Sequence, residues 1–221
     1  MKLDTFQIQY IREYIDAFDI KYYELREEFL DHMILRVEEK MQETDVPFIR
    51  AVMDAKEEFG PGGFKKIMIE REKYLTRQYK FQYQKIVQSY FRFPQAVGSV
   101  LLTALLFGIG QVVPNPIKAI TILVAATITL SLLEIAVSFK YRQVSRQPLL
   151  QVAVLFKTLG LAIIMANMCV FLNVCFKDAN HNSLLLIAVY SVIGTVAITC
   201  FLAYRKLRQQ VMSNVKRLYF S

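Results

Sequence analysis

Four long apolar stretches dominate the second half of the chain, and polar or proline-containing turns separate them. Crossing the hydrocarbon core of a bilayer takes about 20 consecutive apolar residues in a helix, and each stretch is about that long. The residues from Val100 to Ile109 are apolar on all sides apart from Thr103, which is typical of a helix surrounded by lipid. We therefore predict four transmembrane helices. They are expected at 93–113, 117–139, 151–174 and 183–204.

Charge is distributed unevenly around these stretches. Residues 1–60 carry 8 Lys or Arg and 15 Asp or Glu, a net charge of −7, whereas 61–92 and 93–221 have net charges of +6 and +9. A basic total can indicate nucleic-acid binding, but these positive charges flank apolar stretches, so we expect a membrane protein and no nucleic-acid partner.

The cations also predict the topology. Thirteen Lys or Arg residues lie within about 20 residues before the first stretch, between the second and third, or after the fourth, whereas only Lys118 and Lys177 lie on the opposite side. Cationic loops stay in the cytosol. We predict a multi-pass protein of the plasma (inner) membrane with both termini in the cytosol.

The residues before the first stretch are predicted to form helices outside the membrane. Asp4 suits the N-cap of a helix that reaches about Phe18, and a second helix is expected over 21–42. In the second helix an apolar residue recurs every four positions, which indicates one buried face. The apolar residues are Leu25, Phe29, Met33, Val37 and Met41, widened by Leu30 and Ile34.

Two further helices are expected before the membrane. Pro47 is expected near the first position of the third, and Gly60-Pro61 ends it. The fourth is expected from about Phe64 to Arg92, and it mixes aromatic residues with Lys and Arg, as suits an anionic lipid surface. Lipid-headgroup contacts are expected from Arg77, Lys80, Lys85 and Arg92.

Part of this N-terminal region resembles the HAAS-type helical signalling domain. The matching segments are Glu24–His32, an acidic amphipathic helix, then Asp45–Val52, and then Glu58-Phe59-Gly60-Pro61. The resemblance implies a small helical domain attached to a membrane segment. Family members are often encoded beside a PadR-like transcription regulator, so it also implies a signalling role.

The predicted membrane region contains two notable ionisable residues, Glu134 and Lys157. An ionisable side chain in hydrocarbon costs several kcal/mol unless it is paired or reaches the surface. Both residues are expected in the half of the membrane that faces the cytosol, so an ion pair between the second and third spans is the favoured interpretation. A transported-ion or proton site is the alternative.

Catalysis is not expected, because the sequence has no glycine-rich phosphate loop, no Ser/His/Asp arrangement and no Cys-x-x-Cys. Glu28 and His32 lie one helical turn apart and could share a metal, but no second helix offers a histidine to complete the site. We expect no catalytic residue, no cofactor and no metal. Cys169, Cys175 and Cys200 are expected to be small buried residues.

The sequence thus predicts an all-α protein: an integral membrane four-helix bundle (93–221) joined by a basic, aromatic juxtamembrane helix (64–92) to a small N-terminal cytosolic helical domain (1–63). The favoured function is a non-enzymatic signalling or regulatory adaptor. It would bind a cytosolic protein through an acidic face that has no internal partner of sufficient positive charge, and it could also form homo-oligomers. A small transporter or channel subunit, with Lys157, Glu134 and Asn167 near its pathway, is the alternative. The acidic face consists of Glu27, Asp31, Glu38 and Glu39.

The topology can be tested with reporter fusions. A reporter fused after Ser221 is expected on the cytosolic side, and one inserted in the turn 178–182 on the opposite side, because Lys and Arg are so unequally distributed. The measurement is the activity of a reporter that works on one side of the membrane only. A non-cytosolic signal at Ser221 would contradict the predicted topology.

Overall fold

The computed structural model describes residues 2–43, 46–115, 118, 119, 122, 125, 126, 129, 136, 143, 144, 147–158 and 184–219. The chain divides into two compact units. The first comprises Met1–Leu75 together with Arg142–Ala153, and the second comprises Thr76–Tyr141 together with Val154–Ser221. The first unit therefore takes in a short segment from between the predicted second and third spans, which its sequence does not indicate.

Helix α1 (Thr5–Asp16) begins where the sequence predicts it. The Asp4 carboxylate accepts a hydrogen bond from the Gln7 backbone N–H at 2.7 Å, and the Gln7 side chain accepts one from the Asp4 N–H at 3.0 Å. This reciprocal capping box satisfies backbone donors that the first turn leaves without helical partners. Ile11 and Ile15, four residues apart, are buried and pack the helix onto the one that follows.

Helix α2 (Tyr23–Glu43) provides the central apolar face of the first unit. Helix α3 (Phe48–Glu57) packs against α2, and Pro47 is its N-cap rather than a residue of its first turn. The side chains that α3 buries are small, so the two helix axes can approach closely. The buried residues are Leu25, Phe29, Leu30, Met33 and Val37 on α2, and Ala51, Val52 and Ala55 on α3.

The turn from α3 to α4 (Gly63–Tyr90) depends on glycine. Gly60, Gly62 and Gly63 have positive φ angles of 72°, 102° and 50°. Residues other than glycine rarely adopt such backbone angles. The turn reverses the chain within a few residues, so that side chains on both sides of it meet over α2.

An aromatic cluster fills the space under this turn. The ring of Phe64 is 4.5 Å from that of Phe59, 4.8 Å from Phe29 and 5.2 Å from Phe18, measured between centroids. Phe64 is only 1% exposed. Rings in such tilted and edge-to-face arrangements stabilise one another by about 0.5–1.5 kcal/mol per pair beyond the effect of burial.

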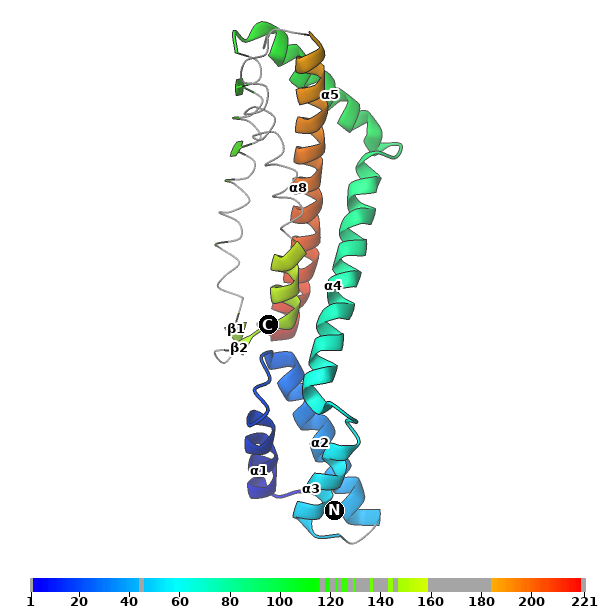
Figure 1. Ribbon diagram of the computed structural model, residues 1–221, viewed down its shortest axis with the longest axis vertical. Coiled ribbons are helices and arrows are strands. Elements are labelled where there is room, and N and C mark those ends of the chain that lie inside the picture. Colours follow the sequence, from blue (N-terminus) through cyan, green and yellow to red (C-terminus); the bar gives the residue numbers. More distant parts are fainter. Residues whose placement is uncertain are drawn as a thin grey trace. The chain divides into compact units, whose positions relative to one another are not determined.

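In the second unit, α5 (Gln95–Val112) and α8 (Leu184–Tyr219) pack side by side (Figure 1). Of the helices that the structure describes, these two are long and apolar enough to cross a membrane. The hydroxyl oxygens of Thr103 and Thr195 lie 2.9 Å apart at their interface. Each hydroxyl also lies 2.9 Å from a backbone carbonyl oxygen of its own helix, that of Ser99 for Thr103 and that of Ser191 for Thr195, so neither is placed between the apolar helices without a partner.

Helix α5 corresponds to the predicted span at 93–113, and α8 contains nearly all of the span predicted at 183–204. However, α8 does not end with the apolar stretch: it continues through the basic tail to Tyr219. The tail is helical because it too buries one face, whose residues recur every four positions. These buried residues are Leu207, Val211 and Val215.

The predicted spans at 117–139 and 151–174 lie mostly outside the described residues, so a bundle of four membrane helices stays a prediction. The described part of the chain is predominantly helical, with one short antiparallel pairing between β1 (Gln143–Val144) and β2 (Gln147–Pro148). A helix follows directly over 150–158.

The aromatic cluster yields a stability prediction. Phe64→Ala should destabilise the first unit by about 3–5 kcal/mol, because it removes a buried ring and leaves a cavity. Amide hydrogen exchange of the full-length protein in detergent should show α2 exchanging at least about 100-fold faster. The matched control is Phe6→Ala, since Phe6 is 79% exposed and its loss should leave exchange in α2 unchanged. Equal effects of both substitutions would contradict this account of the core.

Candidate functional site

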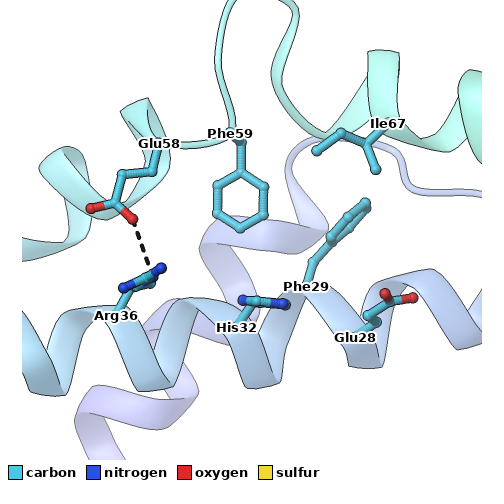
Figure 2. Close-up of a pocket in the computed structure, with 7 residues that line it drawn as sticks. All are labelled: Glu28, Phe29, His32, Arg36, Glu58, Phe59 and Ile67. Atoms are coloured by element: carbon cyan, nitrogen blue, oxygen red, sulfur yellow. Dashed lines mark ion pairs between the residues drawn. The ribbon is translucent and has the colours of Figure 1, made fainter.

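A solvent-accessible pocket of about 250 Å³ lies on the first unit between α2, α3 and the start of α4. Figure 2 shows how its residues are arranged: Glu28, His32 and Arg36 project from successive turns of α2, and Phe59 faces them from the turn that follows α3. Phe29 forms the buried apolar floor, and the His32 ring stands edge-on to Phe59, with centroids 6.5 Å apart. The pocket therefore combines an aromatic interior with a charged rim.

Ion pairs hold one end of the pocket. The Glu58 carboxylate lies 3.2 Å from the Arg36 guanidinium and 2.8 Å from the Lys40 ammonium, and Arg36 also pairs with Glu39 at 2.7 Å. These hydrogen bonds and charges lower the pKa of Glu58, Lys40 being the main cause. The side chains are largely in water, so the pairs orient the rim and add little stability.

A second hollow adjoins the first. It has a volume of about 350 Å³ and shares Glu28 and Ile67 with the pocket. Its other lining side chains are Leu25, Glu70, Arg71 and Tyr74. Glu28 lies 3.4 Å from Arg71, where both side chains are about half exposed. The two neighbouring hollows, which share Glu28 and Ile67, are hereafter called the α2–α4 groove. Its lining has three carboxylates, Glu28, Glu58 and Glu70, and two permanent cations, Arg36 and Arg71.

One turn before the groove, Glu24 connects α2 to the segment 142–153. Its carboxylate accepts a hydrogen bond from the Leu150 backbone N–H at 2.6 Å and a weaker one from Gln151 at 3.4 Å. These two N–H groups open the helix over 150–158, so Glu24 acts as its N-cap from a distant part of the sequence. Burial raises the pKa of the Glu24 carboxyl, an effect that the Leu150 hydrogen bond opposes.

The start of α2 is also attached to α4. The Tyr22 hydroxyl donates a hydrogen bond to the Glu72 carboxylate at 2.9 Å, and Tyr22 is buried. Burial, followed by the bond to Glu72, raises the pKa of Tyr22 to about 12. The hydroxyl therefore remains protonated and able to donate at any physiological pH.

The acidic face differs from the sequence-based expectation in one respect. The sequence predicts that it has no internal partner of sufficient positive charge, but Glu27 lies 3.4 Å from Arg12 and Glu39 pairs with Arg36. That premise is wrong for these two carboxylates, and Glu38 accepts a hydrogen bond from the uncharged Leu3 backbone N–H at 2.9 Å. Glu27 and Glu38 lie against α1 and the residues that lead into it, and Glu39 meets a cation one turn earlier on its own helix. Asp31 is exposed. Partner binding by this face is not tested by these contacts.

The other predicted site residues divide into two groups. Lys157 is exposed on the helix over 150–158, whereas Glu134 lies outside the described residues, as do Asn167, Cys169 and Cys175, so the intramembrane ion pair stays a prediction. Among the described residues no group of three or more His, Cys, Asp or Glu is placed to bind a metal. The residues expected to meet lipid are all exposed: Arg77, Lys80, Lys85 and Arg92.

Sequence reasoning missed the α2–α4 groove and the role of Glu24. From the sequence, Glu28 and His32 are interpreted as a metal pair or as part of a solvated or helix-packing acidic face. Their i, i+4 spacing on the edge of an apolar stripe, with Phe59-Gly60-Pro61 to follow, is a signal for a groove edge. Nothing in the sequence links Glu24 to Leu150, because the contact joins residues 126 positions apart.

No family model, curated protein or solved structure matches the chain. The resemblance to the HAAS-type domain therefore stays a prediction, and the function has to be inferred from the groove and its surroundings.

The Glu24 contact can be tested with two substitutions. Glu24→Ala removes the acceptor and should destabilise the first unit by about 0.5–2 kcal/mol, whereas Glu24→Gln retains an acceptor oxygen. Since the pKa of Glu24 is raised above its ordinary 4.5, the wild-type protein should lose stability relative to Glu24→Gln as the pH rises through the raised value. Amide exchange of a peptide covering 147–158, measured at several pH values, reports both effects.

Glu28→Ala is the matched control for these variants. Glu28 lies on the same helix one turn later and is more exposed, and its side chain pairs with Arg71 rather than with the 142–153 segment. Its loss should leave exchange over 147–158 unchanged. An equal effect of Glu28→Ala and Glu24→Ala would mean that Glu24 does not specifically cap the helix.

Proposed function

We propose that this protein is a membrane-anchored signalling or regulatory adaptor without enzymatic activity. Its α2–α4 groove would bind a segment of a cytosolic protein, and α5 and α8 would anchor it in the membrane as part of a multi-pass bundle with cytosolic termini. The observation that carries the proposal is that one helix, α2, lines the groove with Glu28, His32 and Arg36 and also caps the helix over 150–158 with Glu24.

The chemistry of the groove favours one kind of partner. Its interior offers Phe29, Phe59 and Ile67 to an apolar side chain, and its carboxylates exceed its cations. Residues 1–60 as a whole have a net charge of −7. A helix or loop with an apolar anchor flanked by Lys or Arg is therefore the complementary ligand. Asp31, exposed on the neighbouring turn of α2, adds to the attraction for a basic surface.

The position of Glu24 supports a regulatory role rather than simple attachment. A rigid helix moves as a unit, so a partner that shifts or rotates α2 also alters the distance from Glu24 to the N–H groups of Leu150 and Gln151. The helix that begins there leads, along the sequence, into the predicted third span. Partner binding and the state of the membrane segment would thus be coupled, in both directions, by the same free energy.

Site-specific photocrosslinking tests the proposal in cells. A benzophenone amino acid at Ile67, which lines both hollows, is expected to give a discrete adduct with a cytosolic protein. The double reversal Glu28→Lys with Glu70→Lys should reduce the adduct at least about fivefold, as expected for a loss of about 1 kcal/mol or more. The yield is measured by immunoblot and the partner is identified by mass spectrometry.

Two controls make the result specific. The double reversal Glu43→Lys with Glu57→Lys changes the charge by the same amount at exposed residues that do not line the groove, and it should leave the adduct intact. The same photocrosslinker at Ile49, which is exposed on α3, should not give the adduct. If Ile67 gives none, or if both reversals act equally, the groove is not the partner-binding surface.

A further inference from the structure

The exposed face of α4 in the second unit carries an unusual pattern. Arg77, Phe81 and Lys85 follow one another at intervals of four residues, so they form one column along the helix. All three are exposed, and Phe81 is 56% exposed. On the opposite side of the helix Tyr79 and Tyr83 are buried. The outward face of α4 therefore places an aromatic ring between two cations, although a soluble surface helix would show polar residues there.

The ring and one cation are in direct contact. The Lys85 ammonium lies 4.4 Å from the centroid of the Phe81 ring, a cation–π geometry. Such a pair leaves the ammonium free to bind an anion on its outer side while the ring covers apolar surface. Where α4 ends, Phe91 and Phe93 are also exposed, on both sides of Arg92. Alternating cations and exposed rings suit the boundary between headgroups and hydrocarbon rather than water.

A hydrogen bond shows which part of α8 lies beside this segment of α4. The Tyr83 hydroxyl donates to the Cys200 backbone carbonyl at 3.2 Å. Counted from Leu184, the first residue of α8, about 20 residues at 1.5 Å each cross the hydrocarbon and end near Tyr204. The turn of α4 that carries Phe81, Tyr83 and Lys85 therefore lies beside the end of the apolar part of α8.

The charged residues of α8 indicate that the membrane boundary lies near Tyr204 as well. The polar and cationic residues begin there directly after Tyr204, with Arg205 and Lys206. Helix α8 thus changes from apolar to cationic side chains close to the level of the α4 turn that carries Lys85. Within the set expected to meet lipid, Lys85 lies at this level, and Arg77 lies about 12 Å further along α4 on the cytosolic side.

We propose that the outward face of α4 centred on Phe81 and Lys85 binds an anionic lipid surface, with the ring at the headgroup boundary and the ammonium on lipid phosphates. This inference rests on the proposed membrane crossing by α5 and α8. Charge complementarity and the short connection, 91–94, from α4 to the apolar α5 argue for lipid over a protein partner. The protein as a whole would then respond to the anionic lipid content of its leaflet.

The absence of tryptophan from the chain offers a direct test. Phe81→Trp introduces a single fluorescent indole on the proposed face, hereafter the α4 probe. The full-length variant is placed in nanodiscs of phosphatidylcholine with or without phosphatidylglycerol, using lipids with and without bromine near the headgroup end of the acyl chains. We expect bromine to quench the α4 probe more strongly when phosphatidylglycerol is present. Adding Arg77→Gln and Lys85→Gln should abolish this difference.

A second single-tryptophan variant tests the membrane crossing separately from the lipid-binding face of α4. Val100→Trp places an indole, hereafter the α5 probe, at a position that is 67% exposed, and brominated lipid should quench it in both kinds of nanodisc. If the α5 probe is not quenched, the membrane crossing itself is wrong. If the α5 probe is quenched but the α4 probe is not, or if the α4 probe is quenched equally without phosphatidylglycerol, the lipid-binding face is wrong. A shielded, blue-shifted α4 probe that bromine does not quench would mean that protein covers this face instead.

Discussion

Burial of one face of α2 determines which of its other side chains contact α1 and which line the groove. Successive residues of a helix are rotated by about 100°, so once Leu25, Phe29 and Met33 point into the core, the directions of the remaining side chains are fixed. One edge of the helix then lies under α1, and the other edge lines the α2–α4 groove. The aromatic cluster around Phe64 holds α3 and α4 in register with that face. The groove therefore depends on the core directly beneath it.

Much of the first unit could be predicted from its sequence because its signals are local. The Asp4 N-cap, the apolar stripe of α2 and the Gly60-Pro61 turn each act within a few residues, and the structure has α1, α2, α3 and α4 close to their predicted bounds. The composition of α5 and of the first part of α8 likewise indicates helices that suit lipid. Such patterns depend on side-chain spacing and need no knowledge of what lies opposite.

The features that could not be predicted are those that join distant segments. Arg12 meets Glu27, Leu3 meets Glu38 and Glu24 meets Leu150, and in each case an ordinary surface residue in the sequence acquires its role from a partner elsewhere in the chain. An acidic face is predicted to be unpartnered when only its own helix is considered. The helical tail of α8 is not predicted for a related reason. Its many cations indicate only a basic tail, and the buried Leu207, Val211 and Val215 are spaced among them.

The uninterrupted course of α8 has a mechanical consequence. Its 36 residues make a rod of about 54 Å, of which a bilayer core takes up about 30 Å, so roughly 24 Å extends past the membrane boundary. If α8 crosses the membrane as proposed, it is held by lipid along one part and packs against protein through Leu207, Val211 and Val215 along the other, so it behaves as a lever. If the lipid-embedded part tilts by about 10°, the far end near Tyr219 moves sideways by about 4 Å. Changes in bilayer thickness or lateral pressure, which alter helix tilt, would thereby become displacements large enough to remake side-chain contacts on the cytosolic side.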